Sequence, residues 1–379
     1  MFALMTPELA ALIERIMSFE PKIQAEWDGL PVRARSHYLH RMVIDEIQAT
    51  NEIEQVRSTR KEISEAIKVV QSEQPLANKR FAEMVRLYLD IGNDQAESPQ
   101  TLDDIRAVYD EVTRGEIRDE DAPDGKRFRQ GPVSITSGIE VVHTGVLPES
   151  AIDDALTLML SQGRDDSIPR LIRAVVAHFV FEYTHPFYDG NGRTGRYLLA
   201  LDLGQVLAPY ASLALSATVA DNKDRYYRAF SDAENPLNRG DLTPYLIDML
   251  EIIAEAQHRL LLDLSERRQK IDILAARIGV LVDDEQFPLN LGLDRESTPP
   301  IDSDAIGHVL FTLGQAHYFD ANRAVKLNTL AEVVGRSSQF IRPRLRRLDD
   351  AGIIETVTKR PLRFRLTARG VSLLELDGE

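Results

Sequence analysis

The stretch at residues 184–196 reads THPFYDGNGRTGR and gathers side chains that suit acid–base and phosphate chemistry. Its single histidine, His185, has an ordinary pKa of about 6.5, so it can take a proton from an attacking hydroxyl near neutral pH. Asp189 is a lone carboxylate, and one carboxylate together with phosphate oxygens is a common way to hold Mg²⁺. The stretch therefore supplies a candidate base and a candidate metal ligand.

The same stretch predicts an anion site at the start of a helix. Pro186 is expected to end the incoming helix, and Gly190, Gly192 and Gly195 allow a tight turn and a close approach of ligand to backbone. The N–H groups of a helix that begins near Gly192 or Arg193 would face an anion. Arg193 and Arg196 are three residues apart, so they share a helix face, and guanidinium groups suit phosphate oxygens.

An ordinary helix–helix loop with a surface histidine and two solvated arginines is the alternative interpretation. It is adequate for any one of these residues alone, but it does not account for the whole set. The Walker A pattern GxxxxGK[ST] is absent from the sequence. The residues therefore favour a polyphosphate site of another kind.

Residues 185–196, HPFYDGNGRTGR, resemble the Fic motif HPFx[DE]GNGRxxR of the Fic/Doc family, with every fixed position filled. The resemblance implies a mostly helical core with a β-hairpin flap beside the active site. It also implies a nucleotidyltransferase that uses ATP and Mg²⁺ and moves AMP from ATP to a Ser, Thr or Tyr hydroxyl of a protein. The partner would be a target protein or this chain itself.

The family's roles are carried over onto matching positions. The resemblance makes His185 the general base and Asp189 the Mg²⁺ ligand, and Phe187 would anchor the loop in the core. It assigns phosphate contacts to Gly190, Asn191, Gly192 and Arg193 for the α- and β-phosphates and to Arg196 for the γ-phosphate. Asn222, Tyr226 and Tyr227 lie where the family forms part of its adenine pocket, although a tyrosine pair on a helix fits a core equally well.

The segment Thr50–Glu54 matches the first five positions of the family's inhibitory pattern, [ST]xxxE[GN], with Gln55 where Gly or Asn is usual. Glu54 is then expected to pair with Arg196 and to occupy the site of the γ-phosphate. Thr50 lies one turn earlier on the same helix face. The alternative is the ordinary acidic face of a charged helix.

The elements around these motifs predict a mainly α fold with a C-terminal winged helix, and the resemblance implies a Fic-type helical bundle with a β-hairpin flap. Apolar residues at helical spacing indicate helices, which the resemblance divides into an N-terminal helical region over 1–105 and a Fic core over 106–280. Alternating β-branched residues within the core predict a hairpin centred near Ser137 and Gly138. A Pro- and acid-rich linker is expected at 281–303, and a helix, a helix-turn-helix and two strands over 304–379.

The C-terminal region is locally basic. Residues 322–369 hold 12 Lys and Arg against 4 Asp and Glu, while the whole chain has a net charge of −15. Arg342, Arg344, Arg346 and Arg347 would form a phosphate-contacting face on DNA. A DNA-binding regulator with a nucleotide-sensing Fic core is therefore one alternative function, and AMP removal or transfer of another nucleotide is a second. A winged helix that contacts a protein, or a homodimer, also stays open.

The composition excludes several other classes of protein. The chain has 379 residues and no Cys, which excludes disulfides and thiolate chemistry. It has no run of 18 apolar residues, and its N-terminus resembles an amphipathic helix more than a secretory signal. We expect a soluble, cytoplasmic protein without a membrane partner.

Overall fold

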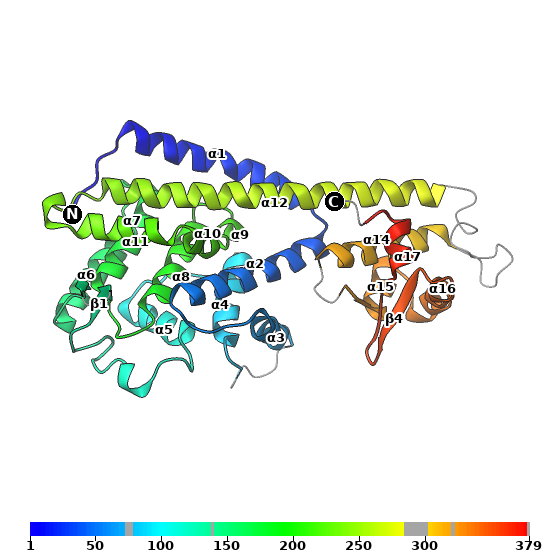
Figure 1. The fold of residues 1–379 in the computed structure, drawn as a ribbon, viewed down its shortest axis with the longest axis horizontal. Coiled ribbons are helices and arrows are strands. Elements are labelled where there is room, and N and C mark those ends of the chain that lie inside the picture. Colours follow the sequence, from blue (N-terminus) through cyan, green and yellow to red (C-terminus); the bar gives the residue numbers. More distant parts are fainter. Residues whose placement is uncertain (73–78, 138–139, 284–301, 320–322, 377–379) are drawn as a thin grey trace. The chain divides into compact units, whose positions relative to one another are not determined.

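The computed structural model describes residues 1–72, 79–137, 140–283, 302–319 and 323–376. Within these residues the chain is mainly helical with two small antiparallel sheets, which confirms the predicted fold class (Figure 1). It forms two compact units, residues 1–25 with 39–262 and residues 26–38 with 263–379. No described helix combines the length and the apolar character that a bilayer span requires.

The first unit contains the elements that surround the motif. Three helices run through both units: α1 (Pro7–Gly29), α2 (Val32–Ile53) and α12 (Thr243–Asp283). The others are α3 (Arg60–Gln71), α4 (Ala82–Gly92), α5 (Leu102–Val112), η1 (Asp119–Asp121), β1 (Ser134–Ser137), β2 (Glu140–Thr144), α6 (Glu149–Gln162), α7 (Arg170–Thr184), α8 (Asn191–Gly204), α9 (Pro209–Ser212), α10 (Leu215–Asp221), α11 (Lys223–Glu234) and η2 (Pro236–Asn238).

Helices α7 and α8 pack against each other at the centre of this unit, with α4 and α5 against α8. Helix α7 is apolar around much of its circumference, because Leu171, Val175 and Phe179 are buried together with Phe181. Helix α5 begins where the sequence predicts a restart after residues 93–99. The Thr101 hydroxyl accepts from the Asp104 N–H, and the Asp104 side chain accepts in return from the backbone of Thr101, which forms a capping box.

The predicted hairpin is present. Strands β1 and β2 pair antiparallel, with Ser134 opposite Thr144 and a register shift between Ile135 and Thr136. The Gly145 N–H donates to the Val133 carbonyl at 3.1 Å and closes the base. Ser137 ends β1, while Gly138 lies outside the described residues.

The second unit holds the C-terminal elements. They are α14 (Ser303–Phe319), β3 (Val325–Lys326), α15 (Leu327–Val334), α16 (Ser338–Asp350), β4 (Ile354–Lys359), β5 (Leu362–Leu366) and α17 (Ala368–Leu373). The sheet order is β3-β5-β4, and Gly335 makes the tight turn between α15 and α16 with φ +67°. The elements follow the predicted order, while the winged-helix assignment and the domain limits stay predictions. Most of the predicted linker, 284–301, lies outside the described residues.

The structure corrects one detail of the basic face. Arg344 is only 7% exposed, its Nη1 donates to the Phe340 carbonyl, and its guanidinium lies 3.5 Å from the centre of the Phe340 ring. This arginine therefore stabilises α16 and does not face solvent. Arg342 and Arg346 are exposed and Arg347 is half-buried, so any DNA contact predicted for this helix depends on these three residues.

The loop between α7 and α8 is anchored by Phe187. Its ring is fully buried and stacks on Tyr109 of α5, with 3.6 Å between ring centres. Phe187→Ala should lower the free energy of unfolding by about 3–5 kcal/mol, because it removes a large buried ring. Urea denaturation would measure this loss. Leu237→Ala is the matched control, since Leu237 is 89% exposed and should change stability by less than about 0.5 kcal/mol.

Candidate active site

His185 marks the end of α7. Pro186 follows it, and the residue before a proline is pushed out of the α conformation, so His185 adopts a left-handed backbone with φ 51° and ψ 61°. Its Nδ1 lies 3.3 Å from the Glu182 carbonyl, which can only accept, so Nδ1 carries the hydrogen. Nε2 is thereby left as the basic nitrogen of the ring.

The His185 backbone is held by an arginine that the sequence reasoning did not single out. Arg129 is fully buried, and its Nε donates to the His185 carbonyl at 2.8 Å. Its other nitrogens donate to the Gly131 and Val146 carbonyls at 2.7 and 2.9 Å. Arg129 therefore connects Gly131 and Val146, which flank the β1–β2 hairpin, to His185, the candidate general base.

Burial, together with the neighbouring His143, lowers the pKa of His185 to about 4. The two rings lie 6.0 Å apart, and Nδ1 of His143 is 2.6 Å from the Glu234 carboxylate. The Glu182 carbonyl and the Glu54 carboxylate oppose this shift without overcoming it. The His185 ring is consequently neutral, and able to accept a proton, throughout the physiological range of pH.

Asn191 closes the loop between the two helices. Its side-chain oxygen accepts from the Phe187 N–H at 2.9 Å, and its amide nitrogen donates to the Phe187 carbonyl at 2.8 Å. Both polar ends of the buried side chain are thus used within the loop. Asn191 shapes the anion site, while its predicted direct contact with phosphate stays a prediction.

No side chain of the loop caps the N-terminus of α8. Gly190 precedes the helix with φ 82°, a conformation that glycine adopts readily, and it provides no side-chain cap. A Cβ on Gly190 would also lie 2.6 Å from Thr113. The first N–H groups of α8 are therefore not capped from within the loop, and the positive end of the helix dipole adds to the attraction for an anion.

Glu54 occupies the space in front of this helix end. A Cβ placed on Gly192 would lie 2.2 Å from Oε1 of Glu54 and 3.0 Å from Nη1 of Arg196. The absence of a side chain at Gly192 is what admits the carboxylate. A carboxylate from α2's end thus lies where the sequence predicts a phosphate group.

Arg196 is bound to both predicted residues of α2. Its guanidinium is 1% exposed, its Nε donates to the Thr50 hydroxyl at 2.8 Å, and its Nη2 donates to Oε1 of Glu54 at 2.8 Å. Burial is the largest single effect and opposes the charge of each partner, but their mutual attraction and hydrogen bond, together with neighbouring groups, outweigh it, so the pKa of Glu54 is lowered and that of Arg196 is raised. Both groups are charged, and the bond is charge-assisted.

Arg193 has an acidic partner of its own. It is 1% exposed and its Nη1 is paired with the Glu116 carboxylate, which comes from the segment after α5. Its Nε is buried and has no hydrogen-bond partner among the described residues. Both arginines of the predicted anion site are therefore held by carboxylates, and a phosphate group must compete with Glu54 and Glu116.

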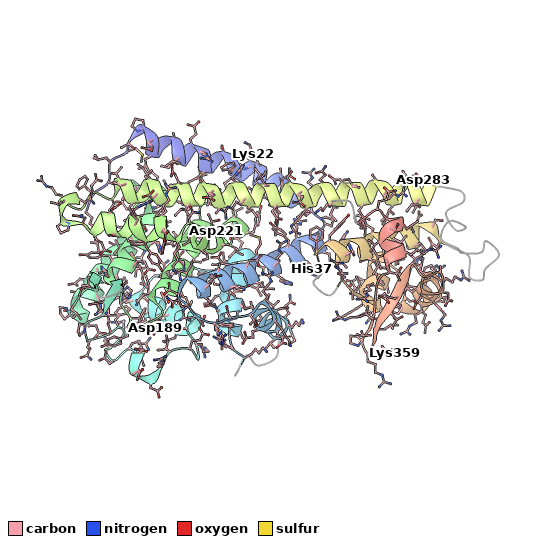
Figure 2. The ribbon with its side chains drawn as sticks, viewed as in Figure 1. Lys22, His37, Asp189, Asp221, Asp283 and Lys359 are labelled. Carbon is pink, nitrogen blue, oxygen red and sulfur yellow. The ribbon has the colours of Figure 1, made fainter. Side chains whose placement is uncertain are left out.

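Asp189 is exposed at the loop between α7 and α8 (Figure 2). One of its carboxylate oxygens, Oδ1, accepts from the Gly190 N–H at 2.6 Å. The described residues contain no cluster of three or more His, Asp or Glu side chains arranged for a metal. A single exposed carboxylate beside a phosphate site fits Mg²⁺, which keeps most of its waters and takes few protein ligands.

The three residues predicted to lie beside adenine differ in burial and in hydrogen bonding in the structure. Tyr226 is 2% exposed, and its hydroxyl bonds to Nε2 of His178 at 2.8 Å within an aromatic cluster. Tyr227 is 44% exposed, and Asn222 bonds to Glu255 and the Thr218 carbonyl. Tyr227 lies close enough to Glu54 that this charge, added to burial, raises its pKa to about 12. Tyr226 is thus part of the core, while adenine contacts of Tyr227 and Asn222 stay predictions.

Glu182 on α7 is a further titratable group near Arg196 that the sequence did not reveal. Its carboxylate lies against α8, since a Cβ on Gly195 would be 2.1 Å from Oε1, and that oxygen has no hydrogen-bond partner among the described residues. Burial raises the pKa of Glu182 to about 8. Only its position three residues before His185, next to an apolar helix face, hinted at it.

Comparisons with known proteins show what the region that contains the motif is similar to. Residues 99–203 match the model described as the Fic/DOC family. The protein adenylyltransferase fic-1 of Caenorhabditis briggsae is 33% identical over 106 residues, which is 27% of this chain and 19% of that relative. The chain thus spans about a fifth of the length of this curated relative.

Two solved structures are similar in fold. A Fic family protein from Desulfovibrio desulfuricans has a TM-score of 0.55 and 21% identity, and the match covers 96% of this chain and 97% of that one. A Fic domain containing signaling protein from Bacteroides thetaiotaomicron has a TM-score of 0.47 and 16% identity over 69% of this chain and 98% of its own. Residues 99–203, which contain the motif, are therefore similar to the Fic/DOC family domain.

Gln55, the residue that departs from the family's inhibitory pattern, has a physical explanation. It follows Glu54 at the end of α2 and adopts a left-handed backbone with φ 58°. The next N–H, that of Val56, donates to the Asn51 carbonyl at 2.8 Å, which completes the turn. Gly and Asn are the residues that tolerate this conformation best, so glutamine holds the turn with some strain.

Gln55→Gly should therefore stabilise the end of α2 by about 0.5–1 kcal/mol. Native-state hydrogen exchange of the Val56 amide should slow about two- to fivefold, since local opening of this turn becomes rarer. Gln55→Ala is the control, because alanine keeps the Cβ and gains nothing. Equal exchange rates in all three proteins would contradict the strain.

Proposed function

We propose that the chain is a protein adenylyltransferase that uses ATP and Mg²⁺ and is restrained by Glu54. The observation that carries the proposal is the Glu54 carboxylate bound to Arg196 in front of the α8 N-terminus. A negatively charged group already lies where a polyphosphate would bind. The target is a protein with a Ser, Thr or Tyr hydroxyl, and this chain is included among the candidates.

The proposed reaction follows from the tautomer of His185 and from the charges of Arg193 and Arg196. Nε2 of His185 takes the proton of the target hydroxyl, and the hydroxyl oxygen forms a bond to the α-phosphorus of ATP. The bond from that phosphorus to the bridging oxygen breaks, and pyrophosphate leaves. Arg193 and Arg196 would neutralise the phosphates, and Mg²⁺ at Asp189 would add charge neutralisation when bound.

The restraint follows from competition for one guanidinium. Arg196 donates to Glu54 through Nη2, and the γ-phosphate needs the same donor. A charge-assisted bond of this kind is worth roughly 1.5–3 kcal/mol, which corresponds to about 10- to 150-fold in affinity. ATP that binds without this contact is held weakly, or in a pose unsuited to transfer.

Glu54→Gly should raise labelling of the chain or of a target by at least about tenfold with ATP labelled on the α-phosphate. Glu52→Gly is the matched control, because it places the same residue in the same helical turn on an exposed position. Glu54→Gly combined with Arg196→Ala should lose the gain, and with His185→Ala it should lose transfer while still binding ATP.

The result distinguishes the alternatives. Equal labelling by the wild-type chain and Glu54→Gly would remove the restraint from the proposal. Label that arrives only from the γ-phosphate would replace AMP transfer by a kinase activity. Loss of label from a previously labelled target, faster with Glu54 than without it, would indicate AMP removal.

The pH dependence offers an independent check on the base. His185 is active as a proton acceptor in its neutral form, and its pKa is lowered from about 6.5 to about 4 by burial and by His143. The kcat/KM of Glu54→Gly should therefore stay level as the pH falls from 8 to 6, and should fall only when the pH approaches the lowered pKa. An acidic limb with its midpoint at 6.5 or above would contradict this environment.

A further inference from the structure

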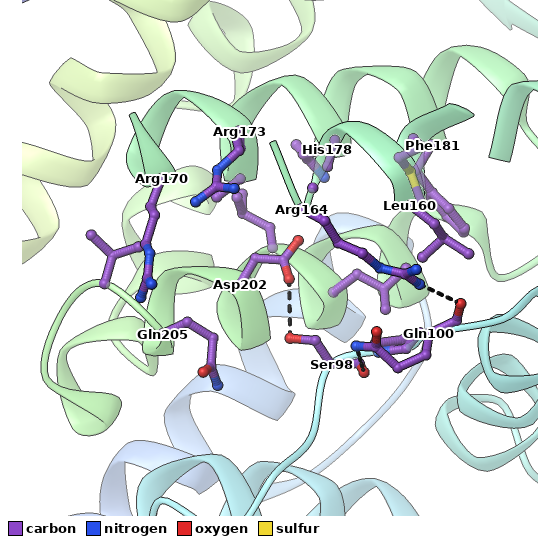
Figure 3. Close-up of a pocket in the computed structure, with 18 of the residues that line it drawn as sticks. Ser98, Gln100, Leu160, Arg164, Arg170, Arg173, His178, Phe181, Asp202 and Gln205 are labelled. Atoms are coloured by element: carbon purple, nitrogen blue, oxygen red, sulfur yellow. Dashed lines mark hydrogen bonds between the residues drawn. The ribbon is translucent and has the colours of Figure 1, made fainter. Parts of the chain in front are cut away.

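A cavity of about 350 Å³ lies in the first unit, away from the motif (Figure 3). Its wall is formed by α7, the C-terminal half of α8, the connection between α6 and α7, and residues 98–100. None of the residues 185–196 lines it. Its size is within the range of about 300–1,000 Å³ that is usual for small-molecule sites.

Three arginines line the cavity, and they differ in whether a carboxylate already pairs with them. Arg173 is buried and pairs with Asp166 at 3.3 Å, while Nη2 of Arg164 donates to the Gln100 carbonyl at 2.7 Å. Arg170 is exposed and has neither a hydrogen bond nor an ion pair within the described part of the chain. Arg164 and Arg170 therefore keep guanidinium donors that no carboxylate satisfies.

The acidic side chains that line the cavity compensate the charge of its arginines only in part. Asp166 is 87% exposed, so its pair with Arg173 is screened by water. Asp202 accepts from the Ser98 hydroxyl at 3.4 Å, and burial raises its pKa to about 6. Figure 3 draws Arg164, Arg170 and Arg173 around Asp202. The cavity carries an excess of positive charge, concentrated on the two arginines without an acidic partner.

The remainder of the lining is apolar and suits the body of a ligand. It comprises Ile105, Met159, Leu160, Phe181 and Leu198, with Gln205 and His178 as neutral polar groups. Sites for small molecules combine such a surface with a few placed polar groups that fix the orientation of the ligand. The arginines provide that fixed point for an oxyanion, because the guanidinium fork matches carboxylate and phosphate oxygens.

We propose that this cavity binds a small organic anion, an apolar body with one terminal phosphate or carboxylate, whose oxygens are held by Arg164 and Arg170. The occupant would lie against His178. Nδ1 of His178 donates to the Gly195 carbonyl at 3.1 Å, and Gly195 lies between Arg193 and Arg196 on α8. The side chain of His178 thus connects the proposed binding site to α8, which carries the anion site of the motif. Binding in the cavity does not depend on the transfer activity.

The test uses the full chain and isothermal titration calorimetry with three probes of one size. Phenyl phosphate and phenylacetate carry the two oxyanions, and benzyl alcohol is the neutral counterpart. We expect one or both anions to bind with a stoichiometry of one, and benzyl alcohol to bind at least about tenfold more weakly. Binding of only one anion identifies which oxyanion the cavity takes.

Variants then locate the binding. Arg164→Ala combined with Arg170→Ala should weaken the anion by at least about tenfold, and both positions are exposed, so the fold should persist. Arg239→Ala, an exposed arginine outside the cavity, should leave the affinity unchanged. Failure of both anions to bind at millimolar concentration, or equal affinity of the double variant and the wild type, overturns the proposal.

Discussion

The buried guanidinium of Arg196 is the group on which the arrangement of the site depends. A charge with 1% exposure is tolerated only when its donors are satisfied, and two of the partners come from the end of α2. Removing one partner of a buried pair leaves the other charge uncompensated, which costs several kcal/mol. Any ligand that displaces Glu54 must therefore bring its own negative charge, and this requirement selects for phosphate groups over neutral molecules.

The same logic applies on the other side of the α8 N-terminus, where Glu116 holds Arg193. A site with two arginines and two carboxylates is nearly balanced in charge when it contains no ligand. A polyphosphate that enters it exchanges one set of anions for another, so the gain depends on which anion fits the guanidinium planes better. The balance explains how arginines so deeply buried avoid the full cost of desolvation.

The sequence was sufficient for the parts of the site that depend on local rules. Pro186, the glycines and the spacing of Arg193 and Arg196 set the loop and the helix start, and the Thr50–Glu54 pattern led to the partners of Arg196. The fold class followed from helical periodicity and the hairpin from β-branched alternation. The loop, the helix start and the hairpin depend on neighbours within a few residues, which a sequence displays directly. The pair of Glu54 and Arg196 spans 142 positions, and it was expected only from the resemblance to the family's inhibitory pattern.

What the sequence did not reveal depends on contacts between distant segments. Arg129 holds His185 across 56 positions of the chain, and Glu116 holds Arg193 across 77. Neither residue stands in a recognisable pattern, and Arg344, which seemed part of a solvent-facing basic helix, turns inward onto Phe340. Tyr226 likewise lies on the inner face of α11, a choice that only the packing of His178 and Phe230 decides.

The left-handed backbone at Gln55 has a consequence for how completely a restraint of this kind can act. Backbone strain of about 0.5–1 kcal/mol would multiply the population of any opened form of the turn that presents Glu54 about two- to fivefold relative to glycine. In the proposed enzyme that population alone would transfer AMP. The AMP-transfer rate of the restrained enzyme would then depend on one backbone dihedral. A glutamine at position 55 would leave a higher residual activity than a glycine there.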